Sequence, residues 1–311
     1  MKWVTMKLLR HTEDFKKHEN ESVVTIGVFD GVHLGHQAII SDCVWEARRR
    51  GVPAVVFTFE RNPREVVCGE HPCIITDPEH KLRILDELGA DYTISVRFTR
   101  KFAAIEPEEF CRSLLAEHLG ALKVCVGENF HYGASGKGDI HTLKAEGKRS
   151  RFSVHVVPLV QIDDLGQLSS TLIRGLITEG RAHDVMTGLG RPYTVKGKVI
   201  PGHSRGKKLG FPTANLALEC EFCVPPDGVY AGKALLGADK YKCAINIGKN
   251  PTFGDHETAL EVFLLDFAGN IYGESLEIEF HHRLRDEKTF GSAEELVRQM
   301  KKDVARARAL Q

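Results

Sequence analysis

The stretch Ile26-Gly-Val-Phe-Asp-Gly-Val-His-Leu-Gly-His36 joins an apolar run to a glycine-rich turn that carries two histidines three residues apart. Residues 23–28 are apolar and largely β-branched, which is typical of a buried parallel strand. Residues 37–50 alternate apolar and charged side chains at helical spacing and stop at Gly51. The stretch is therefore predicted to form the turn between a strand and a helix of an α/β domain.

A turn of this kind is suited to binding an anion. Gly27 and Gly31 let the backbone approach a phosphate, and the start of the following helix offers free N–H groups and a positive dipole end. His33 and His36 add directed hydrogen-bond donors. Short motifs recur by chance, so a plain tight turn with solvated histidines is the alternative. The strand before the motif and the helix after it favour a nucleotide-phosphate site.

Composition limits the classes of partner. A chain of 311 residues suits two domains better than one. Lysine plus arginine (42) equals aspartate plus glutamate (42), so no global positive field draws the protein to nucleic acid or to an anionic membrane. No apolar run approaches the length of a membrane span, and the N-terminus lacks a sustained apolar core. We expect a cytoplasmic protein that acts on small molecules.

Eight cysteines without an export signal indicate reduced thiols. Cys125 and Cys243 lie in apolar runs, where cysteine serves as a small buried hydrophobe. Cys220 and Cys223 form the one Cys-x-x-Cys pair, and a zinc site would need two further ligands at suitable spacing. No second pair exists, so metal binding or redox use of this pair is disfavoured.

The first half of the chain alternates strands and helices. Strands are predicted at residues 23–28, 52–59, 92–96 and 122–126, and helices at residues 37–50, 77–88 and 107–119. This order predicts a doubly wound α/β domain, in which ligands bind beyond the carboxyl ends of the strands. Residues 127–130 follow the last of these strands and should face the cleft that holds the histidine turn.

Two later segments of this half are candidates for phosphate contact. Residues 132–138 are rich in glycine, and a surface loop and a phosphate contact are equally consistent with them. Residues 169–174 open a short helix, where hydroxyls commonly serve only as caps. Capping does not explain Arg174, which can reach a triphosphate from one turn into that helix.

The histidine motif after a first parallel strand resembles the signature of the nucleotidylyltransferase superfamily. Together with Gly-Glu-Asn-Phe at 127–130 and Ser-Ser-Thr-Leu-Ile-Arg at 169–174, it resembles the FAD synthetase domain of bacterial bifunctional riboflavin kinase/FAD synthetases. The resemblance implies a Rossmann-like domain in which His33 and His36 contact ATP phosphates during adenylyl transfer. The nucleotide-binding residues that it implies are Gly27, Phe29, Asp30, Gly31, Asn129, Ser169, Thr171 and Arg174.

Two departures from this family pattern stand out. Arg61-Asn62 occupies the place where the family usually has Pro-His, so no role is carried over for the missing histidine. Asn62 is the candidate substitute as a hydrogen-bonding group. His131 stands where an arginine is common, which leaves the neighbouring contact open.

The second half changes period. After two short helices at residues 171–178 and 182–189, strands are predicted at residues 193–200, 228–236, 241–247, 259–267 and 275–284. An amphipathic helix follows from Ser292 to about residue 309, with Glu295 placed for a capping pattern. This order predicts a small antiparallel β-barrel with a terminal helix. We place the domain boundary near Met186, giving domains of residues 1–185 and 186–311.

The informative string of the barrel is Gly202-His-Ser-Arg-Gly-Lys-Lys-Leu-Gly-Phe-Pro-Thr-Ala-Asn215. A basic glycine loop is often only a solvated loop. The Thr213 hydroxyl and the Asn215 amide oxygen, however, lie two residues apart on an extended chain and can turn to one hard cation. Mg²⁺ takes few protein oxygens and accepts the rest from phosphates and water. The string therefore predicts an Mg²⁺–ATP site, with Gly206 and Gly210 in its phosphate loop.

Glu261 interrupts an apolar strand, where a carboxylate is costly to bury without purpose. Strand alternation could equally point it outward. Pro-Thr-Ala-Asn after the glycine loop resembles the riboflavin kinase signature, and this resemblance implies that Glu261 accepts the proton of the ribityl 5′-hydroxyl. Asp266 in the same run is expected to be structural.

The resemblance extends from about Val23 to Ala307 and implies two activities. The barrel would phosphorylate riboflavin to FMN with ATP, and the α/β domain would adenylylate FMN to FAD and release pyrophosphate, both with a divalent cation. Two alternatives are a nucleotidylyltransferase for a non-flavin phosphate and a non-enzymatic flavin-binding regulator. The kinase motif in the same chain disfavours the first, and the joint presence of His33, His36, Thr213, Asn215 and Glu261 disfavours the second.

Overall fold

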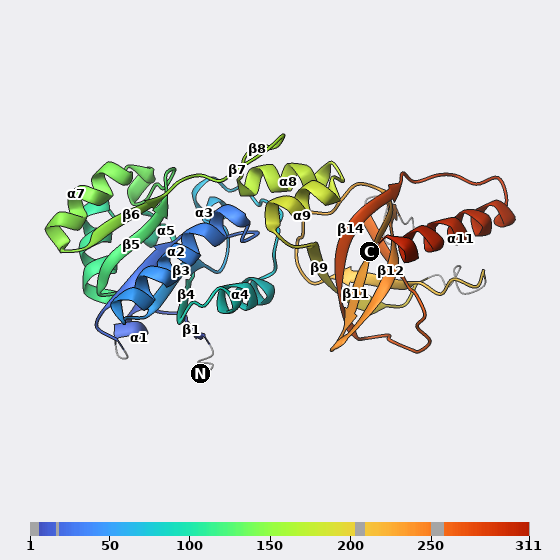
Figure 1. Ribbon diagram of the computed structural model, residues 1–311, viewed down its shortest axis with the longest axis horizontal. Coiled ribbons are helices and arrows are strands. Elements are labelled where there is room, and N and C mark those ends of the chain that lie inside the picture. Colours follow the sequence, from blue (N-terminus) through green and yellow to red (C-terminus); the bar gives the residue numbers. More distant parts are fainter. Residues whose placement is uncertain (1–5, 17–18, 203–208, 250–257, 311) are drawn as a thin grey trace. The chain divides into compact units, whose positions relative to one another are not determined.

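The computed structural model describes residues 6–16, 19–202, 209–249 and 258–310. The chain divides into two compact units (Figure 1). Unit 1 holds residues 1–72 and 78–169, and unit 2 holds residues 73–77 and 170–311. Unit 2 therefore includes one short segment, residues 73–77, from the first half of the sequence.

Unit 1 is built on a six-stranded sheet in the order β1-β4-β3-β2-β5-β6, and every strand pair in it is parallel. The strands are β1 (Lys7–Leu9), β2 (Ser22–Ile26), β3 (Ala54–Phe59), β4 (Tyr92–Val96), β5 (Ala121–Gly127) and β6 (Ser153–Val157). After β2 the chain adds β3 and then β4 on one side of β2. It later adds β5 and then β6 on the other side of β2. The strand order thus reverses between β2 and β5, the position at which such sheets bind ligands.

Helices cover both faces of this sheet, which confirms the doubly wound α/β prediction. On one face, Val23, Ala54 and Cys125 pack against α2 (Leu34–Arg50). On the other face, Val24 and Val124 pack in a second core with Phe110 and Leu114. The remaining helices of unit 1 are α1 (Thr12–Lys16), α3 (Arg64–Val67), α4 (Pro78–Glu87), α5 (Arg100–Ala103), α6 (Pro107–Glu109), the π-helix η1 (Phe110–His118), the 3-10 helix η2 (Ala134–Gly136) and α7 (Ile140–Ser150). A two-stranded hairpin of β7 (Gln161–Ile162) and β8 (Gly166–Gln167) follows β6.

Unit 2 contains a closed six-stranded antiparallel barrel in the order β10-β13-β12-β11-β14-β9, as predicted. The strands are β9 (Tyr193–Ile200), β10 (Ala214–Leu218), β11 (Gly228–Leu236), β12 (Asp239–Lys249), β13 (Thr258–Leu264) and β14 (Ser275–Arg285). Their side chains alternate between the barrel interior and its outer face. Leu260, Val262 and Leu264 of β13 are buried in this way, whereas Ala259, Glu261 and Phe263 are only partly buried.

The terminal helix α11 (Ala293–Ala309) covers part of the outer face of the barrel. Its Ala307 packs with Val229 and Ala231 of β11. The Ser292 hydroxyl accepts a hydrogen bond from Glu295 N at 3.2 Å, which is the predicted N-terminal cap. This cap satisfies one of the N–H groups that a helix start leaves without an intrahelical acceptor.

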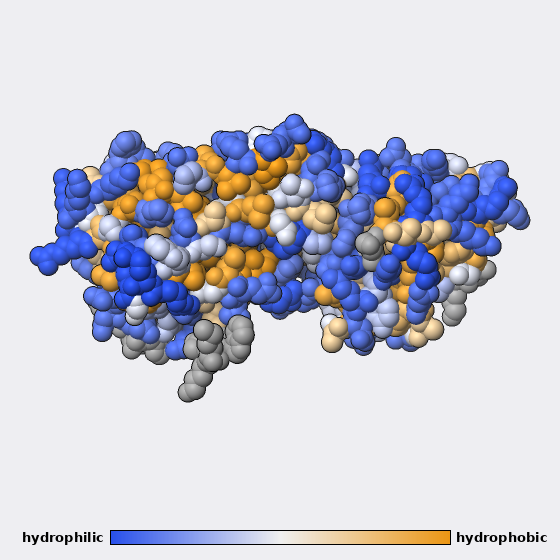
Figure 2. Space-filling model, in the orientation of Figure 1, coloured by the Kyte–Doolittle hydropathy of each residue, from blue (hydrophilic) through white to orange (hydrophobic). Residues whose placement is uncertain are grey.

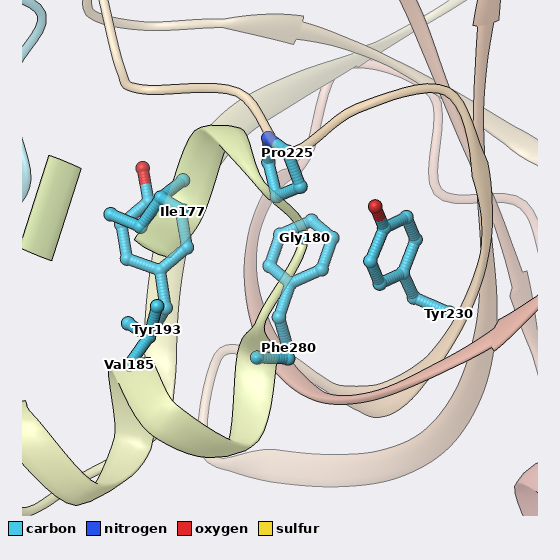
Figure 3. Close-up of a pocket in the computed structure, with 8 residues that line it drawn as sticks. Ile177, Gly180, Val185, Tyr193, Pro225, Tyr230 and Phe280 are labelled. Carbon is cyan, nitrogen blue, oxygen red and sulfur yellow. The ribbon is translucent and has the colours of Figure 1, made fainter. Parts of the chain in front are cut away.

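Helices α8 (Ser170–Thr178) and α9 (Ala182–Leu189) belong to unit 2, so the compact units divide after Ser169 and not at residue 186. The two helices pack on each other, and α9 packs on β9 and β14. Figure 3 shows the small apolar pocket where they meet the barrel. It is lined by Ile177, Gly180, Ala182, Val185, Tyr193, Pro225, Tyr230 and Phe280. Both helices were predicted within a residue of these bounds, but the sequence of a helix does not reveal which surface it will cover.

Residues 73–77 are held within unit 2 by a disulfide bond between Cys73 and Cys223. Ile74 extends this attachment, because it donates to Glu221 O at 2.9 Å and accepts from Cys223 N at 3.0 Å. The expectation that all eight cysteines are reduced was therefore wrong for these two. Cys223 is bonded to a cysteine 150 residues away in the sequence, and Cys220, the other member of its Cys-x-x-Cys pair, is free.

The surface is mixed in character. On the face that Figure 2 shows, hydrophobic residues surface mainly over unit 1, between hydrophilic side chains. The large hydrophobic residues that are most exposed within the described ranges are Leu8, Trp45, Val67 and Tyr272, which lie far apart in the sequence. None of the described helices is both long enough and apolar enough to span a bilayer.

Candidate active sites

The histidine turn links the end of β2 to the start of α2 at the point where the strand order reverses. Phe29, Gly31 and Val32 all have positive φ values, of 50°, 84° and 38°. Such a backbone is strained for the two non-glycine residues, at on the order of 1–3 kcal/mol each. A Cβ at Gly27 would lie 2.9 Å from the buried Phe29 ring, so only glycine fits there. Asp30 lies between Phe29 and Gly31 in this turn.

The two histidines lie side by side at the start of α2. Their rings stack with centroids 3.6 Å apart and planes 20° apart. His33 is buried and caps the helix, because its Nδ1 accepts a hydrogen bond from His36 N at 3.3 Å. An accepting Nδ1 places the ring proton of neutral His33 on Nε2. A Cβ at Gly35 would lie 3.2 Å from the His33 ring, so the glycine makes room for the stack.

His36 is held in its neutral form. Burial lowers the pKa of His36 well below its usual value, and the neighbouring His33 and Lys81 lower it further. Its Nδ1 is buried and has no hydrogen-bond partner among the described residues. An unpaired buried nitrogen costs about 1–3 kcal/mol, which a ligand that pairs with it would recover. The ring is thus neutral and pre-placed at a helix start that favours anions.

Asn129 follows the neighbouring strand β5. Because β2 and β5 pair in parallel, with Thr25 opposite Cys125, their carboxyl ends lie at the same edge of the sheet. Phe130 N donates to Gly127 O at 3.1 Å, which closes the turn, and the Asn129 side chain is exposed. The structure therefore brings Asn129 to the edge that carries the histidine turn, as predicted from the strand order.

The segments around this edge differ in how they use their polar groups. Asn62 Oδ1 accepts from Arg64 N at 3.1 Å, so the candidate substitute for the missing histidine caps a local turn at α3. Tyr132 and Gly138 exchange two backbone hydrogen bonds of 3.0 and 2.9 Å, which ties the glycine-rich segment into a closed loop. His131 Nδ1 lies 3.0 Å from Asn129 O and so contacts the candidate site through the backbone.

The residues of the serine-rich helix start fall in both units. Ser169 is the last residue of unit 1, whereas Thr171 and Arg174 belong to unit 2 on α8. Thr171 is exposed. Arg174 Nε donates to Cys73 O at 2.8 Å, within the attachment of residues 73–77.

A polar row crosses three strands of the barrel. Asn215 of β10 is opposite Glu261 of β13, and Glu261 is opposite Asn246 of β12. Directly opposed residues of antiparallel strands project from the same face, so these three side chains are neighbours. The Thr213 hydroxyl donates to Glu261 Oε2 at 3.4 Å. Glu261 does point to the outer face, but it points into a polar cluster there.

The same cluster contacts the incoming glycine loop. Asn215 is buried, and a Cβ at Gly202 would lie 2.0 Å from its Nδ2, so the backbone of Gly202 packs directly on the amide. Gly210 has φ = 84° in the turn before β10 and therefore needs glycine. Gly206 lies outside the described residues. Asn246 was not predicted as a site residue, because only the strand register reveals its position beside Glu261.

The oxygens of Thr213, Asn215 and Glu261 are hard donors of the kind that Mg²⁺ prefers. Mg²⁺ keeps several waters and uses only one or two protein ligands beside substrate phosphates, so a short set of oxygens suffices. No group of three or more His, Cys, Asp and Glu side chains in the described part of the chain could hold a metal. The oxygen set is therefore of the kind that can hold a cation together with the phosphates of ATP.

Comparisons with known proteins cover both halves. Residues 15–172 match the FAD synthetase family, and residues 189–311 match the riboflavin kinase family. The bifunctional riboflavin kinase/FMN adenylyltransferase of Escherichia coli K12 is 35% identical over 306 residues, covering 97% of each chain. The protein of the same description from Listeria monocytogenes is 37% identical over 290 residues, covering 92% of this chain and 91% of its own.

The fold also recurs in a solved structure. A Streptococcus pneumoniae protein described as a macrolide-efflux protein has a TM-score of 0.89 and 31% identity to this chain, covering 98% of this chain and 99% of its own. One family match lies in each half of the chain, and the curated relatives are of nearly equal length. The chain belongs to the family of bifunctional riboflavin kinases/FMN adenylyltransferases, which phosphorylate riboflavin to FMN with ATP and transfer AMP from ATP to FMN to form FAD.

Proposed function

We propose that the first half of the chain, up to about residue 185, transfers AMP to FMN, and that the barrel with its terminal helix phosphorylates riboflavin. The observation that carries the first assignment is the stacked pair of His33 and His36, which lies where the strand order of the sheet reverses. The Nδ1 atom of His36 is buried and has no hydrogen-bond partner among the described residues. The polar row around Glu261 supports the second. The equal numbers of acidic and basic residues agree with small-molecule substrates.

In adenylyl transfer, a phosphate oxygen of FMN attacks the α-phosphorus of ATP, and the bond to the pyrophosphate breaks. His33 and His36 donate hydrogen bonds from their ring N–H groups to oxygens of the α-phosphate, where negative charge develops. The helix start and the glycine turn add backbone donors to the same oxygens. The residues that bind the nucleotide are proposed to be Gly27, Phe29, Asp30, Gly31, Asn129, Ser169, Thr171 and Arg174.

In riboflavin phosphorylation, Glu261 accepts the proton of the 5′-hydroxyl as its oxygen attacks the γ-phosphorus of ATP. Its hydrogen bond to Thr213 orients the carboxylate. Gly206 and Gly210 let the loop backbone approach the phosphates. Thr213 and Asn215 would hold Mg²⁺, which neutralises phosphate charge when it is bound.

One assay tests this division. The purified chain is incubated with riboflavin, ATP and Mg²⁺, and the flavins are separated over time. We expect FMN to appear first and FAD to follow, with both steps stopped by a chelator of divalent cations. A chain that binds flavin but forms neither product would be a regulator. A chain that forms FMN but does not transfer AMP to it would be a nucleotidylyltransferase whose acceptor is a phosphate other than FMN.

A further inference from the structure

Lys81 is a buried lysine at the same edge of the sheet as the histidine turn. Its side chain is only 9% exposed, and its Nζ donates to Phe59 O at 3.2 Å. Burying an ammonium is costly unless it is paired or used. An ammonium carries three N–H donors. The Lys81 ammonium makes one hydrogen bond to the described residues, the bond to Phe59 O. Two donors are thus available to a ligand.

The position of Phe59 fixes where this ammonium lies. Phe59 is the last residue of β3, which pairs with β2 so that Phe57 is opposite Ile26. One residue before Phe59, the Thr58 hydroxyl donates to Val28 O at 3.0 Å. The Lys81 ammonium therefore lies level with the beginning of the histidine turn, one strand away.

Helix α4 presents Lys81 to the turn. Ile84 and Leu85 follow Lys81 by three and four residues and so share its helix face. Both pack in one apolar cluster with Phe29 and Val32 of the histidine turn. The same packing that holds the turn in its strained backbone thus holds Lys81 against it.

We propose that Lys81 binds the phosphates of ATP at the adenylyl-transfer site and neutralises the pyrophosphate as it leaves. This inference rests on the proposed function of the histidine turn. When the FMN oxygen bonds to the α-phosphorus, the electron pair of the broken bond stays on the pyrophosphate oxygen. A fixed ammonium close to that oxygen stabilises the added charge most in the transition state, and its low exposure strengthens the interaction.

The alternative is that Lys81 only satisfies the carbonyl of Phe59. Lys81→Met keeps the buried stem and removes the charge, and Lys81→Arg keeps the charge. For Lys81→Met we expect kcat/KM for ATP in FAD formation to fall by about 10²-fold, with a higher KM for pyrophosphate in the reverse reaction. Lys81→Arg should regain a substantial part of the loss. Riboflavin phosphorylation by the same protein should stay within about twofold of the parent, which controls for folding.

The parent enzyme offers a test that needs no variant. Burial lowers the pKa of Lys81 to about 8, while Asp30 opposes this shift and Arg10 adds to it. Only the protonated amine attracts phosphate, so kcat/KM for ATP in FAD formation should decline as the pH rises through about 8. In Lys81→Arg this decline should move to higher pH, because arginine stays charged. The Lys81 charge also lowers the pKa of His36, so Lys81→Met is compared at a pH where His36 is neutral.

Three outcomes separate the possibilities. A folded Lys81→Met protein that forms FAD within twofold of the parent, with the same KM for pyrophosphate, overturns the role of Lys81. If Lys81→Met does not fold, an unchanged kcat/KM of the parent between pH 7 and 9 overturns it instead. His36→Ala is assayed in parallel. Normal FAD formation by His36→Ala would reject the proposed site itself, whereas its loss with an unaffected Lys81→Met rejects only the inference.

Discussion

His36 combines three features that are set by its immediate neighbours: a stacked His33 ring, a lowered pKa and a buried nitrogen without a partner. His36→Ala removes the proposed donor to the α-phosphate, so FAD formation should fall on the order of 10²-fold or more. FMN formation should continue at the parental rate. The flavins are quantified from one reaction mixture. A parallel loss of both activities in a folded protein would contradict the assignment of separate sites.

Glu261 is the proposed base of the kinase site. Glu261→Gln keeps the shape of the side chain but cannot accept the proton, so riboflavin phosphorylation should fall roughly 10²–10⁴-fold. Supplied FMN should still become FAD. Asp266→Asn is the matched control, because Asp266 lies two residues after the end of β13 and its carboxylate accepts from the Arg308 guanidinium at 2.6 and 2.8 Å. Equal rates for the two variants would make Glu261 a structural residue.

At the scale of elements, the sequence predicted strands best where both faces are buried. All residues of β2 and β3 are buried, and their apolar runs were unmistakable. The edge strands β1 and β6 are partly exposed and carry no such run. β10 was missed because its five residues begin inside the polar Thr-Ala-Asn string. The partners of Glu261 follow from strand register, which a single sequence does not contain.

Helix α2 is tied to the sheet by a buried carboxylate. Glu46 accepts from Arg49 at 2.6 Å and lies 2.8 Å from both Arg50 and Lys123 of β5. Bonds from Arg49 and Lys123 hold the pKa of Glu46 well below its usual 4.5. A carboxylate whose pKa is lower in the folded than in the unfolded protein stabilises the fold at every pH above its unfolded pKa. This stabilisation is lost as the pH falls from the unfolded pKa towards the folded pKa.

Glu46→Gln should therefore lower the free energy of unfolding of unit 1 by about 1–3 kcal/mol at pH 7, since it weakens three charged contacts. The difference between parent and variant should shrink as the pH is lowered below about 4.5. Urea unfolding at several pH values measures it. Glu117→Gln is the control, because this exposed carboxylate makes one surface ion pair, with Arg112. A pH-independent difference would show that packing, not charge, is lost.

At the scale of the whole molecule, the chain does not divide where its sequence changes period. Residues 73–77 leave unit 1 in sequence and join unit 2 through Cys73–Cys223 and the bridge between Ile74 and Phe222. Arg191 adds a hydrogen bond to Thr76 Oγ1 at 3.1 Å. These links connect residues more than one hundred positions apart, so neither spacing nor periodicity could indicate them. The two activities were predictable because each motif is a short continuous stretch of sequence. The boundary between the units depends on contacts between residues that are far apart in the sequence.

The boundary can be tested with two fragments of the barrel half. A fragment of residues 186–311 cuts α9 and loses Ile177, Ala182 and Val185, which line the apolar pocket against Tyr193 and Phe280. A fragment of residues 170–311 keeps them. Both carry Cys223→Ser, because Cys73 is absent from each.

We expect residues 170–311 to unfold cooperatively and to phosphorylate riboflavin without forming FAD, as an independent domain does. The shorter fragment lacks α8 and part of α9 and therefore several apolar side chains that pack on the barrel. Each large buried side chain contributes about 2–5 kcal/mol to the free energy of unfolding. The fragment of residues 186–311 should therefore unfold at a markedly lower denaturant concentration. Equal midpoints would show that α8 and α9 stabilise the barrel little and would favour a division at residue 186. A folded longer fragment without kinase activity would show that phosphorylation requires residues 73–77 or the rest of unit 1.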